Sequence, residues 1–158
     1  MKQIINGNEY EISLKADLRG ADLQKADLRW ANLRGADLRG ADLADTCLDP
    51  NANPNGDSTE FMRDGDFVVG YRTAISPIMG GEGYVAGKTY EATVFSVAET
   101  ECHPGLYLCP TPIGLEGAKL KVWAKPDEIH RAGTNWRCKK FYKVENYDEN
   151  PQPEKALI

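Results

Sequence analysis

Residues 16–50 read ADLRG ADLQK ADLRW ANLRG ADLRG ADLAD TCLDP, which is one five-residue unit written seven times. Leu holds the third place of every unit, and Ala holds the first place in six of them. A period of five matches neither the 3.6-residue period of an α-helix nor the two-residue alternation of a strand. The repeat therefore predicts a solenoid.

These tandem units resemble the pentapeptide-repeat family. The resemblance implies a right-handed quadrilateral β-helix with four units per coil, in which the central Leu and the small residue two places before it point inward. Seven units then make just under two coils, and residues twenty apart stack, with Leu18 under Leu38 and Ala16 under Ala36. The other places face outward. There the expected binding face carries Arg19, Arg29, Arg34 and Arg39.

Some members of that family imitate B-DNA and bind topoisomerases. Residues 15–50 carry six bases against seven acids, and the array is short. A nearly neutral, two-coil face is a poor imitation of a duplex. A scaffold or docking module is the favoured interpretation.

Repeat arrays need capped ends. Residues 1–15 are the expected first cap, because the Asn6-Gly7 dipeptide favours a tight hairpin turn. The strand pair around that turn is expected to use Ile4, Tyr10, Ile12 and Leu14. The other end of the solenoid is expected to dock on a second domain.

The remaining chain divides into a linker at 51–66, a β-rich or α+β domain at 67–145 and an extended tail at 146–158. Short β-branched and aromatic runs between Gly and Pro predict strands. These runs lie at 67–75, 84–90, 92–97, 106–109, 119–123 and 136–145. A short helix at 115–119 and a turn at 127–131 complete the expected fold, which is mainly β.

Three pieces of this second domain resemble an uncharacterised domain of phage and bacterial proteins that often accompanies pentapeptide repeats. The pieces are Tyr84–Lys88, Glu101–Tyr107 and Trp136–Lys139. Tyr107 stands where that domain usually has His, which puts a His-dependent role in doubt. The resemblance implies a phage or prophage source and no established activity.

Charge is unevenly spread along the chain. The net charge is −5, yet residues 117–145 hold eight bases against three acids, so this stretch is +5 and the rest sums to −10. Bases interleaved with aromatic residues can bind single-stranded nucleic acid by charge and stacking. The same mixture also suits a half-buried strand pair with its lysines outward. The candidate anion or nucleic-acid patch is Lys119, Lys121, Trp123, Arg137, Lys139 and Lys140.

Cysteine and histidine are the usual ligands of zinc. The residues that invite this interpretation are Cys102, His103, Cys109 and Cys138. The chain has no CxxC spacing, and adjacent Cys102 and His103 cannot readily turn to one ion. Buried thiols in a tight core are the favoured interpretation, and no metal is expected.

An enzymatic alternative follows from two short strands. Gly105-Leu106-Tyr107-Leu108 and Val68–Arg72 resemble strands of ADP-ribosyltransferases. In that resemblance Arg72 grips NAD, Tyr107 or Tyr84 stacks on nicotinamide, and Glu116 orients the ribose. Both motifs also fit ordinary alternating strands with a surface Arg. The glycine-rich run 79–83 is not followed by Lys-Ser/Thr, so it is not a phosphate loop.

The leading hypothesis is a non-enzymatic, phage-type interaction protein, or a structural or accessory part of a virion, that acts through protein–protein contacts without a cofactor. An ADP-ribosyltransferase-like enzyme using NAD and a nucleic-acid-binding module are the competing classes. The polar start is no signal peptide and no stretch suits a membrane, so the host cytoplasm or a virion is the expected location. The expected partner is a virion or host protein. The solenoid end or the closing Ala156-Leu157-Ile158 would support an oligomer.

Overall fold

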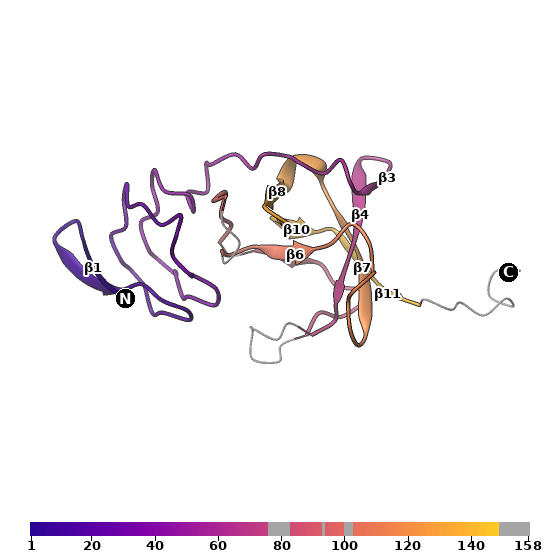
Figure 1. The fold of residues 1–158 in the computed structure, drawn as a ribbon, viewed down its shortest axis with the longest axis horizontal. Helices are drawn as coiled ribbons and strands as arrows, with labels where there is room; N and C mark the ends of the chain where they lie inside the picture. The colour runs from indigo at the N-terminus through magenta and orange to yellow at the C-terminus, as the bar shows by residue number, and fades with distance from the viewer. Residues whose placement is uncertain (76–82, 93, 100–102, 149–158) are drawn as a thin grey trace, which may run out of the picture.

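The computed structural model describes residues 1–75, 83–92, 94–99 and 103–148. An N-terminal hairpin and the repeat lie at one end of the molecule, and several short antiparallel sheets lie at the other (Figure 1). We call residues 62–148 the sheet part. Within the described ranges there is no α-helix, only one turn of 3-10 helix, η1 (Pro126–Glu128). The fold is therefore mainly β, as the sequence predicted.

The N-terminal hairpin pairs β1 (Lys2–Ile5) with β2 (Asn8–Glu11) in an antiparallel register. Asn6 and Gly7 connect the strands with positive φ angles of 51° and 83°. Two successive left-handed residues are typical of the type I′ turn, whose twist matches the strands. The expected hairpin is confirmed.

The hairpin packs on the repeat through part of the expected set, since Tyr10 and Ile12 contact the repeat cluster whereas Ile4 and Leu14 are exposed. Ile5 and Ile12 are buried and belong to the same apolar cluster as the repeat leucines. Ile4 is 70% exposed and Leu14 is 49% exposed. Because neighbouring strand residues point to opposite faces, burial of Ile5 directs Ile4 to solvent.

Each repeat unit ends in a tight turn. The N–H of the first-place residue donates to the carbonyl of the preceding third-place Leu, as from Ala21 to Leu18 (3.2 Å) and from Ala26 to Leu23 (3.1 Å). The seven third-place leucines are all buried, at 0–8% exposure. The fifth place often has positive φ, which explains its glycines, since glycine adopts that conformation without strain.

Residues twenty apart pair between successive turns of the repeat. Parallel bridges join Asp17 to Asp37 and Asp22 to Asp42. The Leu18 N–H donates to the Asp37 carbonyl at 2.8 Å, and the Leu23 N–H donates to the Asp42 carbonyl at 3.0 Å. The twenty-residue stacking that the family resemblance implied is found at these two pairs.

Among its described residues the sheet part holds three antiparallel sheets, with strand orders β11-β7-β4-β3, β6-β9-β8 and β10-β5. The strands are β3 (Met62–Asp64), β4 (Phe67–Thr73), β5 (Tyr90–Glu91), β6 (Leu106–Leu108), β7 (Lys119–Ala124), β8 (Ile129–Ala132), β9 (Asn135–Cys138), β10 (Lys140–Phe141) and β11 (Lys143–Tyr147). Val68, Val122, Ile129 and Phe141 are fully buried and bring the sheets into one core.

Gly70 permits a close crossing inside that core. A Cβ atom at this position would lie 2.7 Å from Leu108 Cδ1 and 3.2 Å from the Cys109 carbonyl oxygen. Real side chains do not tolerate the shorter contact, so β6 can cross β4 here only because residue 70 lacks a side chain.

The predicted strand at 136–145 is wrong as a single element. The chain passes instead through β9, β10 and β11, each in a different sheet. Breaks fall at Lys139 and Tyr142, whose N–H groups donate to the Glu128 and Trp123 carbonyls. This switching ties the three sheets together.

The predicted strands at 84–90 and 92–97 are also wrong, apart from the short β5. A turn interrupts the first, with the Lys88 N–H donating to the Val85 carbonyl. In the second, the N–H groups of Ala92, Ser96 and Val97 donate to three separate segments, so no ladder forms.

Two further predictions can be compared with the structure, and two segments cannot. The helix predicted at 115–119 is wrong, because β7 begins at Lys119 and loop precedes it. The turn predicted at 127–131 is partly confirmed by η1, but β8 follows at once. The glycine-rich run 79–82 and tail residues 149–158 lie outside the described residues.

The predicted linker at 51–66 is held firmly against the sheet part. The Gly56 N–H donates to the Ile129 carbonyl at 2.9 Å, and Trp136 Nε1 donates to the Asp57 carbonyl at 3.1 Å. Phe61 is buried edge-on against the Trp136 ring, with 5.5 Å between centroids. This segment therefore contributes to the core beside it.

Candidate functional site: the junction of the repeat and the sheet part

The junction is the set of contacts that repeat residues 29–49 make with sheet-part residues 94–107, together with those that the joining segment, residues 51–60, makes with His130. His103 is its centre and is fully buried. Its Nε2 atom lies 2.9 Å from the Arg29 carbonyl oxygen, and its Nδ1 atom lies 2.9 Å from Ser96 Oγ. A carbonyl oxygen only accepts, so Nε2 carries the proton and Nδ1 accepts from the Ser96 hydroxyl.

Ser96 fixes this neutral form of the imidazole. Ser96 is fully buried, and its hydroxyl oxygen accepts the Ala98 N–H at 3.1 Å. Burial lowers the pKa of His103 to about 4, and the nearby Arg137 cation acts in the same direction. His103 is therefore neutral at pH 7 and joins the two parts as a hydrogen-bond bridge.

Arg137 holds the segment that carries Ser96. Its side chain is only 1% exposed, and its Nε donates to the Ser96 carbonyl at 2.7 Å while Nη2 donates to the Ala98 carbonyl. Gly105 makes room for this arginine, since a Cβ there would lie 2.9 Å from Arg137 Cβ. Arg137 thus positions the segment 96–98 against the repeat.

A second contact joins Arg34 to Tyr107. The Arg34 guanidinium lies 5.3 Å from the centroid of the Tyr107 ring, while the Tyr107 hydroxyl donates to the His103 carbonyl at 2.5 Å. A cation over an aromatic face is attracted by the ring quadrupole. Arg34 is thereby turned into the junction.

Cys47 makes the third contact. Its carbonyl accepts the Val97 N–H at 2.8 Å, and its thiol lies beside Ser96. Burial raises the pKa of the Cys47 thiol. Cys47 occupies the second place of its unit, where most other units carry Asp, so the repeat changes residue type where the sheet part docks.

The joining segment makes a fourth contact through His130, which is 2% exposed. The Asn55 N–H donates to His130 Nδ1 at 3.0 Å. His130 Nε2 lies 3.7 Å from Glu99 Oε1, beyond hydrogen-bond distance. Burial lowers the pKa of His130, and Arg137 acts in the same direction.

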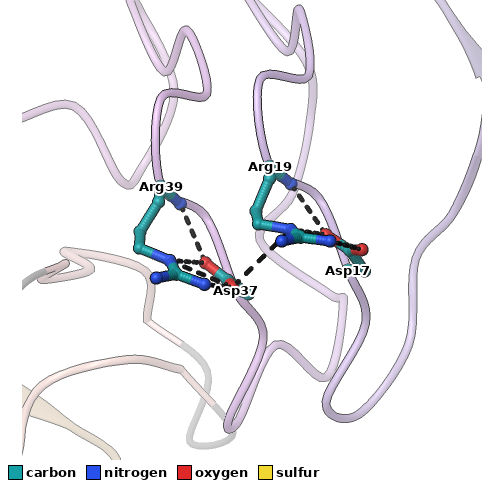
Figure 2. Close-up of polar contacts among 4 residues, drawn as sticks. All are labelled: Asp17, Arg19, Asp37 and Arg39. Atoms are coloured by element: carbon teal, nitrogen blue, oxygen red, sulfur yellow. Dashed lines mark hydrogen bonds and ion pairs between the residues drawn. The ribbon is translucent and has the colours of Figure 1, made fainter.

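The predicted binding face is split by the structure. Arg19 forks onto Asp17 at 2.7–2.8 Å, and Arg39 forks onto Asp37 in the same way (Figure 2). Arg19 Nε also lies 3.9 Å from Asp37 Oδ2, which links the two turns. Arg29 forks onto Asp27 at 2.8–2.9 Å. Arg34 departs from this pattern because Asn32 replaces the partner Asp.

These forks lower the pKa values of the paired carboxylates. The hydrogen bond from Arg19 lowers the pKa of Asp17 to about 2, and the one from Arg29 lowers the pKa of Asp27 to about 2. The exposed ladder therefore carries fixed, alternating charges. Trp30 follows Arg29 and is 81% exposed.

The basic patch gathers lysines on aromatic rings. Lys121 and Lys143 lie 5.3 and 4.5 Å from the Trp123 centroid, and Lys140 lies 4.8 Å from that of Tyr142. The other members are separate: Lys119 contacts the Gly117 carbonyl, Lys139 lies over Phe95, and Arg137 is in the junction. Trp123 is only 6% exposed. Nucleic-acid binding stays a prediction.

The residues of the transferase-like prediction are partly brought together. Arg72 is 9% exposed, stacks 3.9 Å from the Tyr84 centroid and donates to the Tyr107 carbonyl at 3.1 Å. The Tyr107 side chain points instead to His103, and Glu116 is exposed in the loop before β7. The role of these residues with NAD stays a prediction.

Of the four residues weighed as zinc ligands, a site that the sequence did not favour, Cys102 lies outside the described residues. Both ring nitrogens of His103 hold hydrogen bonds, and Cys138 is fully buried with its thiol donating to the Lys140 carbonyl. Cys109 is partly buried. Across the ranges that the structure describes, no three or more metal-ligating side chains gather at one point.

A cleft of about 160 Å³ lies beside the junction, between Leu43 and Leu48 of the repeat and Val94, Phe95 and Lys139 of the sheet part. Ligand pockets usually measure about 300–1,000 Å³. This cleft holds a side chain more readily than a dinucleotide.

Comparison with known families decides the nature of the repeat. The family model described as "Pentapeptide repeats (8 copies)" matches residues 15–49. These residues are a pentapeptide-repeat segment. No curated protein and no solved structure matches the chain.

The pentapeptide-repeat segment covers less than a quarter of the chain, and the sheet part remains unidentified. In the described part of the chain, no helix has the length and apolar character needed to cross a membrane. Sequence reasoning missed Ser96, Cys47 and His130 as junction residues. The signal for Cys47 was present, since TCLDP is the unit that departs most from the repeat.

Proposed function

We propose that the pentapeptide-repeat segment is a right-handed quadrilateral β-helix of just under two coils. The bridges between residues twenty apart and the seven buried leucines support this geometry. The hairpin closes one end through Ile5 and Ile12, and Val94 and Val97 of the sheet part cover the other.

On this scaffold the protein works as a non-enzymatic interaction protein that binds a protein partner. The observation that carries the proposal is the exposed Asp–Arg ladder, whose forks are held in fixed positions on two successive turns (Figure 2). Preorganised side chains lose little entropy on binding. Trp30, exposed beside Arg29, adds the type of aromatic anchor that dominates interfaces.

The junction explains why such a short repeat can serve as a binding surface. Arg34 and the Arg29 carbonyl are engaged by the sheet part, so Arg19, Arg29, Arg39 and Trp30 remain displayed on a supported frame. A structural or accessory role in a virion and a host-directed inhibitor are two forms of this function, in the host cytoplasm or in a virion.

A pull-down from host or infected lysate tests the proposal with three forms of the protein. Wild type and the control K121A/K143A should capture the same protein, and R19A/R39A should lose it. Removing the two arginines leaves the repeat core intact because both side chains are exposed. Equal capture by all three forms would contradict the proposed face.

Single-stranded nucleic-acid binding is the second candidate, supported by the two lysines that lie over Trp123. Fluorescence anisotropy with a labelled oligonucleotide at low salt tests it. Binding that weakens with salt and is lost in K121A/K143A would support it. Absence of binding at low salt would exclude it.

A further inference from the structure

The chain has two histidines, and both lie in the junction, His103 against the repeat and His130 against the joining segment. His103 Nε2 donates to the Arg29 carbonyl of the repeat, and His130 Nδ1 accepts from the Asn55 N–H of the joining segment. Each imidazole is buried and neutral, so each ring carries a proton on Nε2 and none on Nδ1.

A second proton would disturb the hydrogen bonds of His103. Its Nδ1 would become a donor, so the Ser96 hydroxyl would have to turn its own hydrogen elsewhere. The Ser96 oxygen already accepts the Ala98 N–H. Protonation would therefore leave the Ser96 hydroxyl hydrogen without its present acceptor inside a buried cluster, which is costly.

His130 would lose its contact outright. A proton on Nδ1 would face the Asn55 N–H, and two donors repel at the present 3.0 Å. Glu99 lies 3.7 Å from Nε2 and its side chain is 78% exposed, so solvent screens the attraction that it offers to an imidazolium.

Of the other charged and titratable groups around the pair, Arg137 disfavours protonation of both histidines, whereas Glu99 favours protonation of His130. Arg137 lies next to both histidines and is paired with His130 across β8 and β9. His103 further contacts Tyr107 of β6 and the Arg29 main chain, and Cys47 also lies beside Ser96. Glu99 is the acid that faces His130.

We propose that the junction is an acid-release clasp, in which protonation of His103 and His130 frees the pentapeptide-repeat segment from the sheet part. The clasp is intramolecular, so it does not depend on the identity of a partner. Release would uncover the end of the repeat at Leu43 and Leu48, which Val94 and Phe95 flank in the closed state.

The pH window follows from the direction of the shifts. The pKa of His103 falls from 6.5 to about 4 in the folded state, and that of His130 is also lowered. A lowered histidine pKa means that the released state binds protons first as pH falls below 6.5. The closed state is thus fully favoured above pH 6.5. Between pH 6.5 and 4 the ratio of closed to released protein falls, by about tenfold at pH 5 after allowance for solvent screening.

Amide hydrogen exchange of the full chain, corrected for its intrinsic pH dependence, tests the clasp. Between pH 7 and pH 5 the Leu18 and Leu23 amides should exchange about tenfold faster, while the Val122 amide of β7 should stay protected. The double variant H103Q/H130N should show no such acceleration. Gln keeps a donor for the Arg29 carbonyl, Asn keeps an acceptor for the Asn55 N–H, and neither titrates.

Acceleration in the double variant equal to that of wild type would overturn the proposal. So would simultaneous loss of Val122 protection in wild type, which would show whole-chain unfolding. If the double variant does not fold, imidazole NMR of wild type replaces it. Both rings titrating near pH 6.5 with the repeat still protected would refute the clasp, and both staying neutral until the repeat opens would support it.

Discussion

The imidazole of His103 donates from Nε2 to the carbonyl oxygen of Arg29 across 2.9 Å, joining two residues that lie 74 positions apart in the chain. This bond is made by a repeat main-chain group, so it does not depend on the repeat side chains. Together with the Cys47–Val97 bond it couples the order of the repeat to that of the sheet part.

The first prediction concerns Cys47. Replacing it by Asp restores the residue type of the repeat but places a carboxylate beside Ser96 and near Asp27. We expect the free energy of unfolding to fall by about 1–3 kcal/mol, the usual cost of an ill-paired buried polar group. Urea denaturation measures it. Cys47→Ser is the matched control and should lower the free energy of unfolding by about 1 kcal/mol or less. Equal losses in the two variants would contradict the packing of Cys47 beside Ser96.

Departures from the repeat could have identified the junction from the sequence. Trp30, Asn32 and Cys47 interrupt the ADLRG pattern, and Asn32 and Cys47 flank the contacts with the sheet part. Sequence reasoning used the regular units, because regularity predicts the solenoid. Asn32 and Cys47 mark where the sheet part docks, whereas Trp30 is 81% exposed.

A second prediction concerns the fifth place of the repeat. Lys25 has a positive φ of 59°, a strained conformation for a side-chain-bearing residue. Lys25→Gly should therefore leave stability unchanged or raise it by about 1 kcal/mol. Trp30 is not among the positive-φ residues, so Trp30→Gly should lower stability by about 0.5–1 kcal/mol. In thermal melts, the melting temperature should be unchanged or raised for Lys25→Gly and lowered for Trp30→Gly.

A third prediction concerns the exposed ladder. Asp17 titrates near pH 2 because Arg19 donates to it, so Arg19→Gln should return the Asp17 pKa towards 3.8. The folded pKa is depressed, so the contribution of this pair is present above pH 3.8 and is lost as pH falls towards 2. Carboxyl NMR titration measures the shift. Arg34→Gln is the control and should leave Asp17 unchanged, because Arg34 lies over Tyr107.

A fourth prediction concerns Gly70. Gly70→Ala places a Cβ 2.7 Å from Leu108 Cδ1, so the buried Leu108 side chain or β6 itself must shift, and stability should fall by about 1–3 kcal/mol. Gly65→Asn is the control, since nothing lies within 4 Å of that site and Asn tolerates positive φ. Chemical denaturation compares them. Similar stability of the two variants would show that β4 and β6 are not closely packed.

The sheet part was harder to predict than the repeat. The runs at 67–75, 106–109 and 119–123 led to β4, β6 and β7, because they are short apolar runs with β-branched or aromatic residues between turn residues. The segment 92–97 failed for a physical reason: Ala92, Ser96 and Val97 bond to Lys139, Pro104 and Cys47 in turn. Strand propensity is local, whereas these partners are set by the junction.

The buried polar cluster was not predictable from residue types. Arg137 was assigned to an exposed patch because lysines and aromatics surround it in sequence, yet the structure turns it inward to the Ser96 and Ala98 carbonyls. Gly105 lies against Arg137, which leaves no room for a side chain at residue 105. This glycine was therefore a sign in the sequence that Arg137 is buried.

The central claim is that the repeat keeps its fold only while the sheet part covers its open end. Expressing residues 1–52 alone and recording thermal unfolding by calorimetry tests it most directly, with the full chain alongside. We expect a cooperative transition for the full chain and none for the fragment, whose Leu43 and Leu48 lack the cover of the sheet part. A cooperative transition in the fragment would contradict it.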